Sequence, residues 1–144
     1  YGLLEKQFSN LMAEASKKTG QSGSILLELL ERRLDNVVYR SGLAVSRRAA
    51  RQLVTHGHFT LNDHRVDVPS IRIKPGDKIV LRDSSKKNEY FKNIDDVSPA
   101  NSDTVPAWLK VNRKKFEISV SSTPSRDDAE PDINEQLIVE YYSR

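Results

Sequence analysis

Apolar residues recur every three or four positions through the first part of the chain. Between residues 3 and 18 this spacing predicts an amphipathic helix, and Gly20 and Gly23 are the residues expected to end it. Residues 24–40 have the same spacing and predict a second helix. Gly42 stands where a residue in the left-handed conformation would stop that helix.

A third helix is expected from about residue 47 to residue 56, with Ser46 as its cap and Gly57 just beyond its end. Turning each residue by about 100° separates its side chains onto two faces. The polar face holds Arg47, Arg48, Arg51, Gln52 and Thr55. The apolar face holds Ala49, Ala50, Leu53 and Val54. Such a helix can dock by its apolar face while its arginines project together.

The hydrophobic period then changes to two, which is typical of strands. Phe59 and Leu61 alternate with polar residues, and the alternation returns at Val66 and Val68. A hairpin turn at residues 62–63 would join these two strands.

A further strand is expected after a type II turn at Pro75 and Gly76, with Ile79 and Leu81 on one side. Later elements are less regular. They comprise a short helix in residues 89–97 and strands at residues 116–121 and 136–142, separated by a polar loop.

Charge is distributed unevenly along the 144 residues. The net charge of +3 and the isoelectric point near 9.2 are shared by many ordinary proteins. However, no acidic residue occurs from Asn36 to Asn62, whereas seven carboxylates from Glu117 onward face only Arg126 and Arg144. This polarity predicts a basic surface for one partner and an acidic end directed elsewhere.

Composition excludes several classes of chemistry. The chain has no cysteine, so it has no disulfide, thiolate nucleophile or cysteine-ligated zinc, which is compatible with a reducing compartment. No apolar run is long enough to cross a bilayer, and the first residues lack the order of a signal peptide. Because the chain opens on tyrosine, we expect further residues before it in the natural protein.

The basic segment has the chemistry of a nucleic-acid contact. Arginine pairs its planar guanidinium with two phosphate oxygens and also stacks on bases, and histidine can donate to phosphate or stack on an unpaired base. An arginine-rich face is often merely solvated, but such a face normally carries glutamates at neighbouring helical positions, and none occurs here. The candidate RNA contacts are Arg47, Arg48, Arg51, Gln52, His56, His58, Asn62 and Arg65, with Tyr39 and Arg40 added as flanking positions.

Three histidines lie close together in the sequence, at His56, His58 and His64. No cysteine or suitably spaced carboxylate completes a zinc-type ligand set around them. We therefore expect neither a metal site nor a cofactor.

The segment LLERRLDNVVYRSGLAVSRRAARQLVTHGHFTLN, followed by RVDVPSIRIKPGD and the terminal NEQLIVEYYSR, resembles the bacterial-type small-subunit ribosomal protein four family over the whole chain. The RNA-binding module named after that family is shared by other RNA-binding and RNA-modifying proteins, whereas the flanking segments resemble the ribosomal protein alone. Two departures stand out. Asp63 replaces the glycine of the usual Asn-Gly hairpin turn, and the family's basic N-terminal segment is missing before Tyr1.

The resemblance implies an α+β fold with three parts. Residues 1–35 would form a helical part packing with residues 84–144, residues 36–83 the helix-helix-sheet RNA-binding module, and residues 84–144 a C-terminal helix and strands that complete the first part.

The resemblance also implies a structural, rRNA-binding component of the small ribosomal subunit. Such a protein binds the five-prime domain of small-subunit rRNA at a helical junction, nucleates assembly and contributes to translational accuracy. The implied partners are ribosomal protein five and messenger RNA where it enters the ribosome, with no membrane. The implied location is the cytoplasmic ribosome of a bacterium or, alternatively, the ribosome of a chloroplast or mitochondrion.

An RNA-modifying enzyme is the main alternative class. Arg32 to Asp35 reads Arg-Arg-Leu-Asp, which resembles a pseudouridine synthase motif whose aspartate is the nucleophile. Asp35 lies in a helical pattern, however, and a surface ion pair with Arg32 is the expected structure there. The acidic pair Asp127 and Asp128 lacks large apolar neighbours that could raise a pKa. We therefore expect no catalytic residue, and a stand-alone RNA-binding chaperone with the same module remains the alternative binder.

Overall fold

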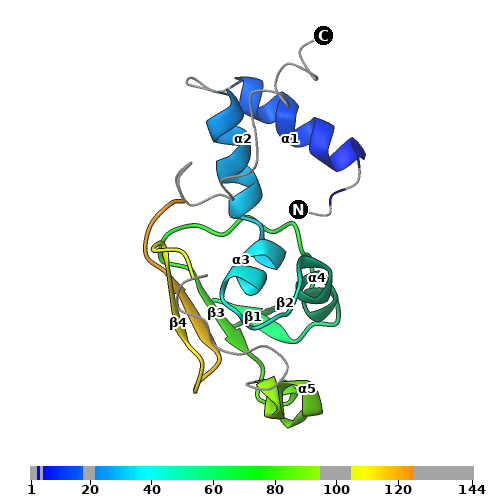
Figure 1. Ribbon diagram of the computed structural model, residues 1–144, viewed down its shortest axis with the longest axis vertical. Coiled ribbons are helices and arrows are strands. Elements are labelled where there is room, and N and C mark those ends of the chain that lie inside the picture. The colour runs from blue at the N-terminus through cyan, green and yellow to red at the C-terminus, as the bar shows by residue number, and fades with distance from the viewer. Residues whose placement is uncertain (1–2, 4, 18–21, 95–104, 125–144) are drawn as a thin grey trace.

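The computed structural model describes residues 3, 5–17, 22–94 and 105–124. Figure 1 shows a pair of helices at one end of an elongated molecule, followed by two further helices packed beside a twisted sheet. The helices are α1 Glu5–Lys17, α2 Ser22–Glu31, α3 Leu34–Arg40, α4 Arg47–Thr55, η1 Ser85–Lys87 and α5 Glu89–Lys92. The strands are β1 Phe59–Leu61, β2 His64–Val66, β3 Lys78–Leu81, β4 Leu109–Asn112 and β5 Glu117–Val120. The expected α+β class is confirmed.

The five strands of the described residues belong to one antiparallel sheet with the order β2-β1-β3-β5-β4. The predicted hairpin is present, since Phe59 pairs with Val66 and Leu61 with His64. Both turn residues have positive φ, 51° at Asn62 and 71° at Asp63, as in a type I′ turn. Asp63 therefore adopts the left-handed backbone that the family's glycine would take without strain.

The prediction of a single helix over residues 24–40 is wrong, because the structure has two helices there, α2 and α3. Arg33 has an extended backbone (φ −66°, ψ 141°) and separates α2 from α3. The first amide groups of α3 find partners outside the helix: Leu34 N donates to Ile71 O at 2.9 Å and Asp35 N to Pro69 O at 3.2 Å. These bonds satisfy donors that a helix start leaves unpaired, which makes the break possible. At the start of α2, Gly23 lies inside the helix instead of ending the first one.

Two apolar clusters lie under these elements. The larger joins α3, α4 and the sheet, with Phe59, Ile79 and Ile118 fully buried at its centre. The smaller lies between α1 and α2 and includes Met12, Leu26 and Leu30. Among the described residues, no helix is long and apolar enough to cross a membrane.

The described residues after β3 add two strands to the same sheet. The expected strand at residues 116–121 is β5, and the expected short helix is α5. Strand β4 was not predicted; it follows the buried Trp108 and pairs with β5. The expected strand at residues 136–142 lies outside the described residues. The packing of residues 1–35 with residues 84–144 stays a prediction, because much of the second segment is likewise outside them.

Candidate nucleic-acid interface

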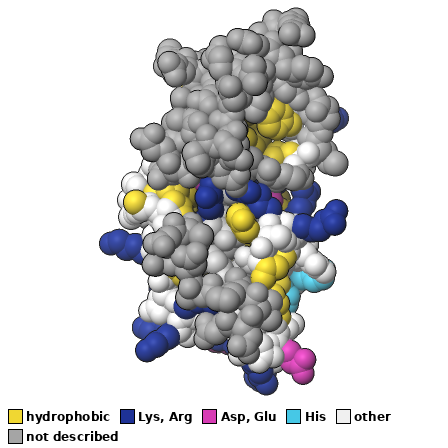
Figure 2. All heavy atoms as spheres, in the orientation of Figure 1, with side chains coloured by type: hydrophobic (Ala, Val, Ile, Leu, Met, Phe, Trp, Pro, Cys, Tyr) yellow, Lys and Arg dark blue, Asp and Glu magenta, His cyan; other side chains and the backbone are white. Residues whose placement is uncertain are grey.

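Helix α4 exposes part of its basic face: Arg48, Gln52 and Thr55 are exposed, whereas Arg47 and Arg51 are half-buried. The Ser46 hydroxyl caps the helix by accepting a hydrogen bond from Ala49 N at 3.0 Å. Ala50 and Val54 are fully buried against the core, whereas Arg48 and Gln52 are exposed on the opposite side. Figure 2 shows Lys and Arg side chains in a band across the middle of one face of the molecule, with a His side chain nearby.

The first arginine of α4 is held against α3. The Arg47 guanidinium carbon lies 4.7 Å from the centre of the Tyr39 ring, so the cation stacks on that ring. The Arg47 Nε and Nη2 atoms both donate to Asn36 Oδ1 at 3.4 Å. Arg40, one helical turn after Asn36 on α3, forms an ion pair with Glu31 at 3.0 Å. Tyr39 and Arg40 are both half-buried.

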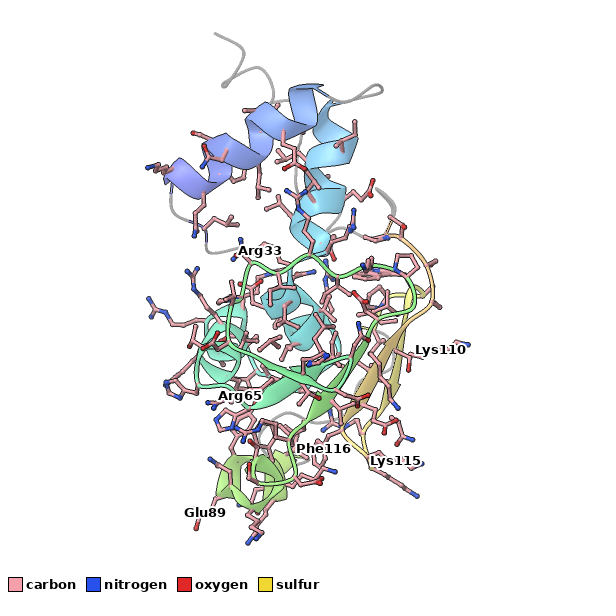
Figure 3. The ribbon with its side chains drawn as sticks, turned by 180° about the vertical axis from the view of Figure 1, so that it is seen from behind. Arg33, Arg65, Glu89, Lys110, Lys115 and Phe116 are labelled. Carbon is pink, nitrogen blue, oxygen red and sulfur yellow. The ribbon has the colours of Figure 1, made fainter. Side chains whose placement is uncertain are left out.

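Two more arginines gather at the C-terminal end of α4. Gly57 has φ +74°, and its missing side chain makes room for Arg65, whose Nη2 lies 2.5 Å from where a Cβ atom would stand. Arg82 Nη1 donates to Gly57 O at 3.1 Å. Cations at this end of a helix are favoured by its dipole. Figure 3 shows Arg65 on this side of the sheet, away from Lys110 and Lys115. Arg82 is not among the contacts predicted from the sequence, because it directly follows β3 and lies far from the basic segment along the chain.

The two histidines after α4 differ in their surroundings. His56 is exposed, whereas His58 is half-buried, with Nδ1 2.8 Å from Ser85 Oγ and its ring 5.7 Å from that of Phe91 in an edge contact. Burial lowers the pKa of His58 below its ordinary value, and the nearby charges of His56 and Arg82 lower it further. The lowered pKa favours a neutral His58, which suits the hydrogen bond to Ser85 within the protein better than a charged contact to an RNA phosphate.

Asn62 fixes the hairpin to the neighbouring turn. Its Nδ2 donates to Asp77 Oδ1 at 2.9 Å, and its Oδ1 accepts from Lys78 N at 2.9 Å. The amide therefore sets the position of the β1–β2 turn relative to β3. On the outer strand of this hairpin, His64 and Arg65 are exposed. Within the described residues, no three His, Cys, Asp or Glu side chains are placed to hold a metal ion.

The expected surface ion pair between Arg32 and Asp35 is wrong. Asp35 is only 4% exposed and binds Arg33 through two hydrogen bonds, Nε to Oδ1 at 3.1 Å and Nη2 to Oδ2 at 3.2 Å. Arg32 pairs with Glu28 instead, at 3.6 Å. The break between α2 and α3 is the reason, because it turns Asp35 inward and brings Arg33 to it. Both carboxylate oxygens of Asp35 are thus engaged within the protein.

Comparison with known proteins identifies the family. Residues 32–79 match the S4 domain family. Over all 144 residues, the chain is 49% identical to small ribosomal subunit protein uS4 of Herpetosiphon aurantiacus, 51% identical to that of Clostridioides difficile and 48% identical to that of Thermus thermophilus. These matches span the whole chain and 68% of each relative.

The chain belongs to the uS4 family of small ribosomal subunit proteins. The S4 domain match runs from the α2–α3 junction into β3, so the RNA contacts predicted from the sequence lie inside it, whereas Arg82 lies just beyond its end. The uS4 matches also cover both flanks of that domain, as the resemblance in the sequence led us to expect. Identity of about one residue in two over all 144 positions confirms that resemblance.

Proposed function

We propose that this chain is a structural, rRNA-binding component of the small ribosomal subunit. The observation that carries the proposal is the polar face of α4, where exposed Arg48 and His56 and half-buried Arg51 lie in a segment without any carboxylate. Family membership supplies the ligand class, because the relatives are named small ribosomal subunit proteins. Arg65 and Arg82 extend the same basic surface beyond the end of the helix.

The surface suits phosphate better than a small molecule. Arginines spaced along one helical face can follow a sugar-phosphate backbone, and each neutralised phosphate releases counterions. Exposed His56 and Gln52 add groups that can stack on or hydrogen-bond to an unpaired base. In this proposal the target is a helical junction in the five-prime domain of the rRNA, bound early in assembly on a bacterial cytoplasmic ribosome.

A salt titration tests this proposal. Each of Arg48→Ala and Arg51→Ala should weaken binding to small-subunit rRNA and reduce the slope of log affinity against log salt by about one unit. The control is Lys110→Ala, an exposed lysine on β4 at the far edge of the sheet. If the arginine variants match the control in affinity and slope, the α4 face is only a solvated surface.

An enzymatic role is the second candidate, and the geometry favours binding over it. Asp35, the residue in the nucleophile-like motif, has both oxygens hydrogen-bonded to Arg33 and is nearly inaccessible. Whole-chain similarity to ribosomal proteins also favours a ribosomal component over a chaperone that shares only the module.

The protein partner in this proposal is ribosomal protein five. Acidic residues would be repelled by RNA phosphate, so the carboxylate-rich C-terminal segment suits a basic protein surface. Messenger RNA where it enters the ribosome would be a further neighbour. Changing Glu130, Asp132, Glu135 and Glu140 to their amides should slow association with protein five at low salt and leave binding to naked rRNA unchanged. Equal association rates at every salt concentration would remove this partner from the proposal.

A further inference from the structure

A buried polar network connects α2 to two of the candidate RNA contacts. Glu31, the last residue of α2, is completely buried. Its Oε1 accepts a hydrogen bond from Arg40 Nη2 at 3.0 Å, and its Oε2 accepts one from Asn36 Nδ2 at 2.9 Å. One carboxylate thus holds a cation with one oxygen and an amide with the other.

Asn36 transmits this arrangement to α4. Its Nδ2 also donates to the backbone oxygen of Glu31 at 2.8 Å, so the amide plane is fixed with Oδ1 pointing away from Glu31. That Oδ1 accepts from both Nε and Nη2 of Arg47, whose guanidinium also stacks on the Tyr39 ring. A flip of the amide would turn Oδ1 toward the two Glu31 oxygens and Nδ2 toward the Arg47 donors, so it would break these bonds, and at 1% exposure Asn36 has little access to water that could replace them.

We propose that Glu31 is a positioning residue for RNA binding, which sets Arg40 directly and Arg47 through Asn36 before RNA arrives. A free arginine side chain loses much rotational freedom when it binds a phosphate, and a fixed one has already lost it. Arg48, the next residue after Arg47, is exposed, and none of the contacts described for this network includes it. The inference deepens the proposed function and rests on it.

The alternative role for Glu31 is to hold the junction of α2 and α3 and nothing more. In that case its loss would lower stability and weaken every RNA contact alike. The network predicts a different pattern, because Glu31 reaches Arg40 and Arg47, Asn36 reaches Arg47 alone, and neither reaches Arg48.

Double-mutant cycles separate the two roles. Asn36→Ala should weaken rRNA binding roughly 2- to 10-fold, the loss expected when one arginine must be ordered on binding. Made together with Arg47→Ala it should add no further loss, whereas together with Arg48→Ala it should keep its full effect. Glu31→Gln should couple in the same way to both Arg40→Ala and Arg47→Ala. Glu28→Gln, which removes a carboxylate that pairs with Arg32 on the surface of α2, is the matched control.

An equal loss from Asn36→Ala in the Arg47→Ala and Arg48→Ala backgrounds would overturn the inference. Failure of Arg47→Ala and Arg48→Ala themselves to weaken binding would instead contradict the proposed function. A measurement on the unmutated protein without RNA decides the inference even if the buried variants do not fold. NMR relaxation of the arginine side chains should find Nε–H of Arg47 more ordered than that of Arg48, and equal mobility of the two would overturn it.

Discussion

Replacing Gly57 with alanine tests the geometry at the end of α4. The backbone there has φ +74°, a region that an L-amino acid enters at a cost of about 1–2 kcal/mol. The new Cβ atom would also lie 2.5 Å from Arg65 Nη2 and 2.8 Å from its Nε, so the guanidinium must move. Moving a cation away from a helix C-terminus lowers the free energy of unfolding by about 0.3–1 kcal/mol more, because the favourable interaction with the helix dipole is lost.

Gly76→Ala is the matched control for this change. Its φ is +90°, and no atom lies within 4 Å of where its Cβ would stand, so it carries only the backbone cost. We expect Gly57→Ala to lower the free energy of unfolding by more than Gly76→Ala does. In an Arg65→Ala background, where the guanidinium is absent, the two glycine substitutions should cost the same.

Urea denaturation can follow this comparison through the protein's single tryptophan. Trp108 is 1% exposed and packs in the same apolar cluster as α4 and the sheet, so its fluorescence reports unfolding of that unit. Gly57→Ala should also weaken rRNA binding, because it displaces Arg65. If Gly57→Ala and Gly76→Ala cost the same in the unmutated background, Arg65 does not pack over Gly57 and the described arrangement at this helix end is wrong.

Three further outcomes follow from the same contacts. Asp63→Gly should stabilise the protein by on the order of 0.5–1 kcal/mol, because Asp63 occupies a left-handed turn position that glycine adopts without strain; an unchanged urea midpoint would contradict this. Ile79→Ala removes a fully buried side chain and should cost roughly 2–5 kcal/mol, whereas Leu53→Ala, at a half-buried position, should cost less than Ile79→Ala in the same denaturation experiment. The depressed pKa of His58 means that the unfolded chain binds more protons between the folded pKa and 6.5, so stability should fall as the pH falls through that window; His58→Asn should flatten this dependence, and an unchanged pH profile would refute it.

Local signals predicted α4 and the hairpin well. The cap at Ser46, the left-handed glycine at position 57 and the two faces of the helix all act within a few residues of one another, so the sequence alone contains them. The hairpin turn at Asn62 and Asp63 is likewise a local feature, and its positive φ values agree with the Asn-Gly turn of the family.

Distant contacts explain what the sequence did not reveal. Residues 24–40 read as one helix because their apolar residues keep helical spacing throughout, yet the break at Arg33 depends on carbonyl groups near residue 70. The wrong ion pair of Asp35 follows from that same break. Strand β4 is only four residues long and is defined by its pairing with β5. No local sequence pattern predicts that pairing.

The exposed positions of the proposed interface could be predicted from the sequence, whereas the contacts among its side chains could not. The outward positions of Arg48, Gln52 and His56 follow from helix periodicity. Arg82 reaches the end of α4 only because β3 runs beside β1 in the sheet. The connection from Glu31 to Arg47 likewise depends on how α2, α3 and α4 pack, so it required the structure.

The most direct test of RNA binding through the α4 face is to map contacts on the protein bound to small-subunit rRNA. Ultraviolet crosslinking followed by peptide mass spectrometry identifies which peptides touch the RNA. Crosslinks should concentrate in residues 47–58 and around Arg65, and Arg48→Ala combined with Arg51→Ala should reduce their yield. Crosslinks confined to β4 and its lysines, with none on α4, would contradict the proposed interface.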